Sequence, residues 1–238
     1  MFDKSISNQT RFSGSHNWIK YSEPDWHFGN ILSDIKKLNN VTGGFHNVIG
    51  LSYKDTTLVE AISKEFNIKG HPSDVIGITN DWLNVGSEEA KKRFSNHLTS
   101  ITKGKRSIII ARRLLDHCAS PTKFLETFNY LPQGSVIYIE INDYKQLVKN
   151  NIYDFIWNER TFYPFSNHIE TIINKAYLYL LSAESICSNS DSIFYSFAQI
   201  NQKAYKYKIN EFNSYSSEIN ILNNYVHHWN KLKNYWNS

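Results

Sequence analysis

The feature that most constrains the fold is a set of short, uninterrupted apolar runs in the middle of the chain. Ser107–Ala111 reads SIIIA, Ser135–Ile141 reads SVIYIEI, and Asp74–Thr79 reads DVIGIT. A strand with one face in water alternates apolar and polar residues, whereas SIIIA and DVIGIT are continuous rather than alternating in hydrophobicity. We therefore expect strands that are covered on both faces, as the strands of a parallel sheet are.

Segments with helical spacing of apolar residues separate these runs. We predict helices at Asn30–Leu38, Leu58–Phe66, Glu88–Leu98, Thr122–Leu131, His168–Asn174 and Glu211–Trp236, and further strands at Asn47–Leu51, Tyr177–Ser182 and Ser192–Ile200. One more strand is expected somewhere between residues 84 and 102. Alternation of strands and helices predicts an α/β, Rossmann-like, doubly wound and mostly parallel sheet, and the late pair of strands supplies an antiparallel edge strand.

Length and composition favour one folded domain. The chain has 238 residues, of which 41% are hydrophobic and 20% are charged, so it can bury a core of its own. We expect residues 1–40 to form an N-terminal arm and a helix, residues 41–205 the Rossmann-like domain, and residues 206–238 a C-terminal helix packed on it.

Charge and cysteine usage narrow the class of partner. The net charge of +4 is spread along the chain without a basic stripe, so nucleic acid is not expected as a partner, and a small anionic substrate would suit the mild excess. Cys118 and Cys187 are too few for a disulfide framework or a metal site. No run approaches the roughly 20 apolar residues that cross a bilayer. We expect a cytoplasmic protein without a metal; the oligomeric state stays open.

Ligands of open α/β sheets bind beyond the carboxyl ends of the strands, so the residues that follow each apolar run are candidate ligand contacts. A glycine at such a point lets the backbone approach a ligand, and the helix that follows offers N–H groups. The candidates are Gly50, Ser52, Tyr53 and Asp55 after the first strand, Thr79 and Asp81 after the second, and Ala111 and Arg112 after SIIIA.

The segment after SIIIA also resembles a known family. Ala111-Arg112, Asp116-His117, Pro121, Gly134 and Glu140 follow the order A-R, acid-H, P, P-x-G and strand-E, and Tyr153–Tyr163 (YDFIWNERTFY) is similar to the pattern Y-D-x-I-x-H-E-H-x-x-Y. This order resembles the C-methyltransferases that act on nucleotide-linked deoxysugars, within the class I enzymes that use S-adenosylmethionine. The chain departs from that family in its altered loop before Asp55 and in lacking the zinc module.

The resemblance implies S-adenosylmethionine as the cofactor and a methyltransferase acting on a sugar or sugar-like small molecule, possibly nucleotide-linked. It makes His117, Glu159 and Tyr163 candidates for acid or base catalysis, and Arg113, Asn158 and Arg160 candidates for substrate binding. Asn158 and Arg160 replace the family's two histidines, and neither side chain accepts a proton, so transfer to oxygen, nitrogen or carbon stays open. The alternatives are a methyltransferase-like binding or scaffolding partner in glycan biosynthesis that has lost catalysis, and an enzyme of other chemistry on the same fold.

Overall fold

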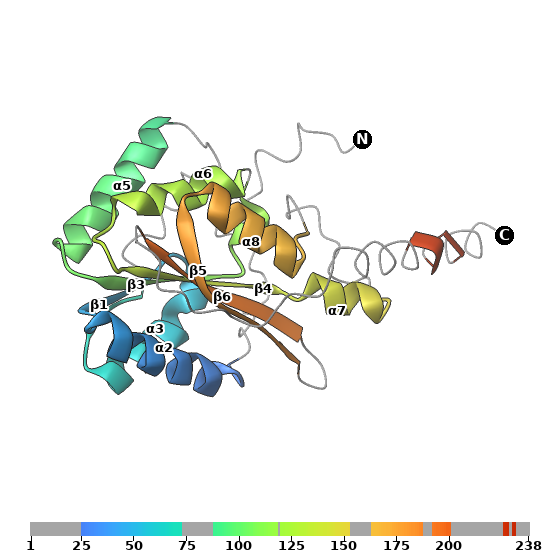
Figure 1. Cartoon of the computed structure of the whole chain (residues 1–238), viewed down its shortest axis with the longest axis horizontal. Coiled ribbons are helices and arrows are strands. Elements are labelled where there is room, and N and C mark those ends of the chain that lie inside the picture. Colours follow the sequence, from blue (N-terminus) through green and yellow to red (C-terminus); the bar gives the residue numbers. More distant parts are fainter. Residues whose placement is uncertain are drawn as a thin grey trace.

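The protein is described by a computed structural model that covers residues 25–72, 88–118, 120–152, 163–187, 192–200, 226–228 and 230–231 (Figure 1). Its elements are α2 (Phe28–Thr42), β1 (Asn47–Gly50), the 3-10 turn η2 (Tyr53–Asp55), α3 (Thr56–Phe66), β2 (Lys69–His71), α5 (Glu88–Thr102), β3 (Ser107–Arg112), η3 (Leu115–His117), α6 (Pro121–Glu126), η4 (Thr127–Tyr130), β4 (Val136–Asn142), α7 (Tyr144–Lys149), α8 (Ser166–Lys175), β5 (Leu178–Cys187) and β6 (Ser192–Ile200).

The strands form one sheet in the order β2-β1-β3-β4-β6-β5. The first four are parallel, while β6 runs against both β4 and β5, so a hairpin closes one side of the sheet. After β1 the chain builds β2 on one side of it and then returns to build β3 on the other. The strand order therefore reverses between β1 and β3, which is where ligands of open α/β sheets bind. The predicted Rossmann-like, mostly parallel sheet is confirmed.

Helices cover both faces of the sheet. Figure 1 shows α2 and α3 on one face and α5, α6 and α8 on the other. Neighbouring strand residues divide between two cores: Ile108 and Ile110 of β3 face α2 and α3, whereas Ile109 and Ala111 face the opposite layer. Each apolar run is continuous because its side chains alternate between two cores and none of them needs to face water.

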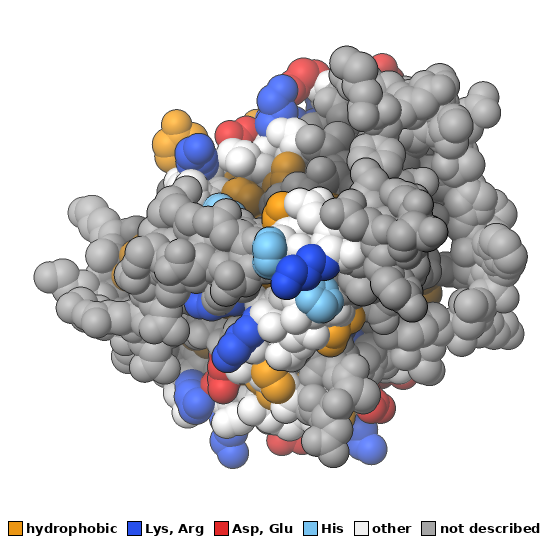
Figure 2. Space-filling view, turned by 90° about the vertical axis from the view of Figure 1, so that its right-hand side faces the viewer, with side chains coloured by type: hydrophobic (Ala, Val, Ile, Leu, Met, Phe, Trp, Pro, Cys, Tyr) orange, Lys and Arg blue, Asp and Glu red, His pale blue; other side chains and the backbone are white. Residues whose placement is uncertain are grey.

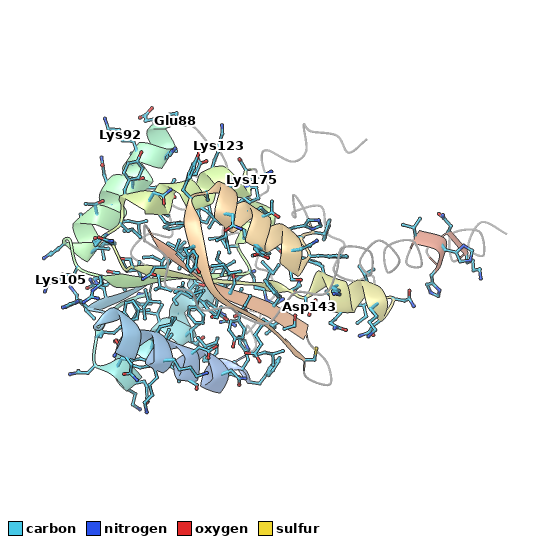
Figure 3. All side chains as sticks on the ribbon, in the orientation of Figure 1. Glu88, Lys92, Lys105, Lys123, Asp143 and Lys175 are labelled. Atoms are coloured by element: carbon cyan, nitrogen blue, oxygen red, sulfur yellow. The ribbon has the colours of Figure 1, made fainter. Side chains whose placement is uncertain are left out.

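The carboxyl ends of the parallel strands lie along one edge. Lys105, which precedes β3, and Asp143, which follows β4, mark opposite ends of the sheet in Figure 3. Register fixes the alignment, since Gly50 of β1 pairs with Ile110 of β3, and Arg112 of β3 pairs with Glu140 of β4. The residues just after these three strands are thereby brought together.

Most elements expected within the described residues are confirmed. The expected strand at Tyr177–Ser182 is longer, since β5 continues to Cys187, and the helix expected at Asn30–Leu38 extends over all of α2. The helix expected at Thr122–Leu131 is divided between α6 and the 3-10 turn η4. The DVIGIT strand and most of the last helix fall outside the described residues, and the domain boundaries stay predictions.

One predicted strand is wrong in part, and two elements of the structure were not predicted. Residues 88–102 are helical throughout as α5, so the strand expected between residues 84 and 102 is wrong for that part. The strand β2 was missed because Lys-Gly-His carries no apolar pattern. The helix α7 was also missed, although its N-terminus has a signal: the Asp143 carboxylate accepts a hydrogen bond from the Gln146 amide at 3.1 Å.

Three phenylalanine rings pack together in the layer of helices that contains α5, α6 and α8. They are Phe94 of α5, Phe124 of α6 and Phe128 of η4. The ring centroids are 5.3–6.1 Å apart, and the three side chains are buried. We predict that Phe128→Ala lowers the free energy of unfolding by about 3–5 kcal/mol, because it leaves a cavity. Urea unfolding measures this. Tyr130→Ala, two residues along and 66% exposed, is the control and should change stability by under about 0.5 kcal/mol.

Candidate functional site

The carboxylate of Asp55 bridges the ends of β1 and β3. One of its oxygens, Oδ2, accepts hydrogen bonds from the backbone amides of Leu51 and Ser52, both at 2.7 Å. The other, Oδ1, accepts one from the amide of Arg112 at 2.9 Å. The side chain is fully buried. We call this arrangement the Asp55 bridge; it spans the point where the strand order reverses.

Gly50, at the start of the loop that follows β1, has a structural role that the sequence did not predict. A Cβ on Gly50 would come within 2.9 Å of the Asp55 Cβ and 3.2 Å of a Val59 methyl group. Gly50 is therefore required by the fold of the loop against α3. The close approach of its backbone to a ligand stays a prediction. The amides of Leu51 and Ser52 are engaged by Asp55.

Ser52 and Tyr53 are the loop residues that offer side-chain groups to a ligand. The Ser52 hydroxyl is buried and, within the described residues, has no hydrogen-bond partner. Such an atom needs a water or a ligand to satisfy it. The Tyr53 ring next to it is 45% exposed. A hydroxyl beside an exposed aromatic ring suits a ligand with both polar and planar parts.

A second group of buried charges, the Glu140 cluster, lies beside the bridge and consists of His27, Arg112, Arg113, Tyr138 and Glu140. The Glu140 oxygen Oε2 lies 2.9 Å from His27 Nε2, 3.0 Å from Arg112 Nε and 2.8 Å from the Tyr138 hydroxyl. Its other oxygen lies 3.4 Å from Arg113 Nε. A carboxylate can only accept, so all four partners donate.

Burial alone would raise the pKa of Glu140, but its partners prevail. The hydrogen bond from His27 and the charges of Arg112 and Arg113 lower the pKa of Glu140 to about 2. Burial and the neighbouring Glu140 charge raise the pKa of the Tyr138 hydroxyl, which keeps it a donor. The cluster therefore holds an ionised carboxylate in the interior, which is stable only while its donors remain in place.

Arg112 connects both groups. Its amide belongs to the Asp55 bridge, its Nε contacts Glu140, and its Nη1 donates to the Lys54 carbonyl at 2.8 Å. Its guanidinium also lies over the Phe28 ring of α2, 5.1 Å from the centroid. These contacts are with protein groups, and Arg112 and Ala111 are both buried. A direct cofactor contact by these side chains stays a prediction.

Arg113 leaves β3 with a backbone turn. Its φ of 50° is in the left-handed region, which is unfavourable for a side-chain-bearing residue, and its amide donates to the Glu140 carbonyl at 2.8 Å. The side chain is 8% exposed, with Nε facing Glu140. Its predicted role in substrate binding stays a prediction.

The predicted residues His117 and Tyr163 are connected through two others. Asp116 is buried and accepts a short hydrogen bond from the Tyr144 hydroxyl; its other oxygen lies 3.8 Å from His117 Nε2. The Tyr163 ring lies 5.3 Å from the Tyr144 ring, nearly perpendicular to it. We call these four residues the Asp116 cluster.

Five predicted site residues, Thr79, Asp81, Asn158, Glu159 and Arg160, lie outside the described residues, and their roles stay predictions. Conversely, sequence reasoning missed His27, Tyr138 and Tyr144. Tyr144 directly follows Asp143 at the end of β4, so the rule of inspecting strand ends could have found it. His27 has no such signal, because only the fold brings it to Glu140.

The described residues contain neither a membrane-spanning helix nor a cluster of metal-binding side chains. In the parts of the chain that the structure describes, no helix is long and apolar enough to cross a membrane. No set of three or more His, Cys, Asp or Glu side chains among the same residues is arranged to hold a metal ion.

Comparison with known proteins gives distant likenesses of fold. No family model matches the chain, and no curated protein does. Similar solved structures include a methyltransferase dependent on S-adenosylmethionine from Clostridium acetobutylicum ATCC 824, at 12% identity and a TM-score of 0.46, covering 79% of this chain and 97% of that one. Magnesium protoporphyrin IX methyltransferase from Synechocystis PCC 6803, with bound SAH, has 10% identity and a TM-score of 0.42, covering 84% and 100%.

A further similar structure is a SAM-dependent methyltransferase from Archaeoglobus fulgidus, at 10% identity and a TM-score of 0.42, covering 72% of this chain and 94% of that one.

The Glu140 cluster predicts a specific dependence of stability on pH. Because the pKa of Glu140 falls from 4.5 to about 2 on folding, its ionisation contributes on the order of 3 kcal/mol that is present above pH 4.5 and lost as the pH falls toward 2. We predict that Glu140→Gln destabilises the protein at neutral pH by about 3–5 kcal/mol, since the buried arginines lose their partner.

Urea unfolding at a series of pH values measures both effects. The wild-type free energy of unfolding should fall steeply with acid, and that of Glu140→Gln should fall less. Glu65→Gln, at an exposed position of α3, is the matched control and should follow the wild type. Equal acid sensitivity of the wild type and Glu140→Gln would contradict the proposed role of the cluster.

Proposed function

We propose that the protein is a methyltransferase that binds S-adenosylmethionine at the carboxyl ends of β1 and β3. The observation that carries the proposal is the reversal of strand order at this point, with the Asp55 bridge shaping the loop there. Ligands of Rossmann-like sheets occupy this place. The order of residues in the segment Ser107–Phe165 resembles that of a methyltransferase family. This resemblance is the reason for proposing S-adenosylmethionine as the cofactor.

The residues beside the bridge fit such a cofactor. The buried Ser52 hydroxyl needs a hydrogen-bond partner, which a hydroxyl-bearing nucleoside provides, and the exposed Tyr53 ring offers a planar surface. Ser52, Tyr53 and the backbone around Arg113 would hold the cofactor. When bound, S-adenosylmethionine supplies an activated methyl group, and the protein orients the acceptor and excludes water.

The chain's own acid-base groups suit a hydroxyl or amine acceptor. His117 is 15% exposed, so its imidazole is accessible enough to take a proton from an acceptor, and the Asp116 carboxylate nearby stabilises the imidazolium that forms. Tyr163, packed against Tyr144, and Glu159 are further candidates. Asn158 and Arg160 stand where the resembling family has histidine, which disfavours proton removal from carbon.

For the acceptor we propose a sugar or sugar-like small molecule, possibly linked to a nucleotide, on the strength of the family resemblance. The net charge of +4 is compatible with an anionic group on that acceptor. Figure 2 shows the side of the molecule that lies at the right in Figure 1, with lysine or arginine and histidine side chains near the centre of the view.

Isothermal calorimetry with S-adenosylmethionine and S-adenosylhomocysteine tests the proposal. We expect saturable binding by the wild type, and we predict that Gly50→Ala weakens it by about tenfold or more, equal to about 1.4 kcal/mol. The reason is that the new methyl group would meet Asp55, Val59 and the Pro72 carbonyl within 2.9–3.2 Å and displace the loop.

Gly29→Ala in α2 is the control, because a Cβ there meets no atom within 4 Å; its affinity should equal that of the wild type. Absence of binding of either ligand at about millimolar concentration would reject the methyltransferase proposal. The binding or scaffolding alternative would then be preferred, since the amides of Leu51 and Ser52 are already engaged by Asp55.

A further inference from the structure

The Asp55 bridge is made entirely of backbone donors. Its three hydrogen bonds come from the amides of Leu51, Ser52 and Arg112, at the ends of two different strands. Because the side chain is fully buried, water does not compete for these bonds. The Asp55 carboxyl group therefore adds to the direct hydrogen bond between the loop and β3, which the Leu51 amide donates to the Ile110 carbonyl at 3.1 Å, and it is the only one of these contacts that can lose its charge.

We propose that Asp55 is a positioning residue whose ionised carboxylate holds the cofactor loop against β3, and that protonation releases this contact, so that cofactor binding depends on pH near neutrality. The part that concerns the cofactor rests on the proposed function. The part that concerns the bridge does not.

Hydrogen-bond directions give the first reason. An ionised carboxylate can accept all three amides, as observed. A protonated carboxyl has a donor on one of its oxygens. The hydroxyl oxygen of a protonated carboxyl still accepts, but more weakly than an ionised oxygen, and its proton needs an acceptor that none of the three amides provides. Protonation of either oxygen therefore weakens the bridge and leaves a buried donor to be satisfied.

The surroundings of Asp55 give the second reason. Burial raises the pKa of Asp55 to about 7, against the lowering influence of the Arg112 and Ser52 amides, the Arg112 guanidinium and the Leu51 amide. Among the described groups, the charge acting on Asp55 is that of Arg112 in β3. That guanidinium contacts Glu140 of β4, which in turn contacts His27 just before α2. In η2, the Lys54 carbonyl accepts a hydrogen bond from Arg112.

The direction of the effect on stability follows from the raised pKa. Between its ordinary value of 3.8 and about 7, the folded protein binds this proton more tightly than the unfolded chain does. The contribution of Asp55 to stability is therefore complete below about pH 4 and decreases as the pH rises toward 7. Glu140 has the opposite sign and acts in a more acidic range, so the two groups can be separated.

Amide NMR across a pH series tests the bridge without any ligand. We expect the amide resonances of Leu51, Ser52 and Arg112 to move together with one midpoint near pH 7, although they belong to separate strands. In Asp55→Asn this shared transition should vanish, while Glu65→Gln should retain it. Should the three amides stay unchanged in the wild type between about pH 5.5 and about pH 8.5, the proposal is overturned, even if Asp55→Asn does not fold.

Calorimetry with S-adenosylhomocysteine over the same pH range tests the cofactor part. If only the ionised form binds, the affinity of the wild type should fall by about tenfold from pH 8 to pH 6, and that of Asp55→Asn should stay constant. If the three amides titrate but the affinity for S-adenosylhomocysteine does not change with pH, the proposed coupling between the bridge and cofactor binding is overturned. If S-adenosylhomocysteine does not bind at any pH, the proposed function is rejected. The role of Asp55 in the bridge is then tested by the amide titration alone.

Discussion

The arrangement of the candidate site depends on one interaction, the acceptance of three backbone amides by the buried carboxylate of Asp55. Parallel strands diverge where their hydrogen bonding ends, and amides at that point need partners. Here the Ile110 carbonyl accepts from the Leu51 amide, and the Asp55 side chain from η2 accepts from the amides of Leu51, Ser52 and Arg112, which fixes the loop after β1 to the end of β3. Position 50 is a glycine because Asp55 and Val59 occupy the space that a Cβ atom would need. The local sequence around the switch in strand order is explained by this bridge.

The Glu140 cluster extends the same principle to the next strand. Burying a carboxylate is costly unless donors surround it, and Glu140 has donors from α2, β3 and its own strand. Arg112 takes part in both groups. It therefore joins the ends of β1, β3 and β4 and the residue before α2 into one polar network. The pKa values of its two carboxyl groups shift in opposite directions, because Glu140 has cationic partners in contact and Asp55 has mainly amides.

The sequence predicted the fold well wherever hydrophobic pattern decides the structure. The run Ser107–Ala111 predicted a two-sided strand because its side chains alternate between two cores, whereas Lys69–His71 pairs through its backbone alone and carries no pattern. Strand ends gave the region of the candidate site, which stays a prediction. Individual contacts there could not be predicted, since His27 and Glu140 are 113 residues apart in the chain, and Asp55 and Arg112 are 57 apart. Asp55 accepts amides from the ends of both strands, a contact that the sequence did not predict, and its cofactor contact stays a prediction.

The central claim is that the carboxyl ends of β1 and β3 form the cofactor site of this Rossmann-like protein. Mapping backbone amide shifts on addition of S-adenosylhomocysteine tests it most directly. The claim predicts that the largest changes fall on Ser52, Tyr53 and Arg113, with little change at Lys69 and Ser107, which lie at the opposite ends of their strands. Changes concentrated at those opposite ends, or no changes at a saturating ligand concentration, would contradict it.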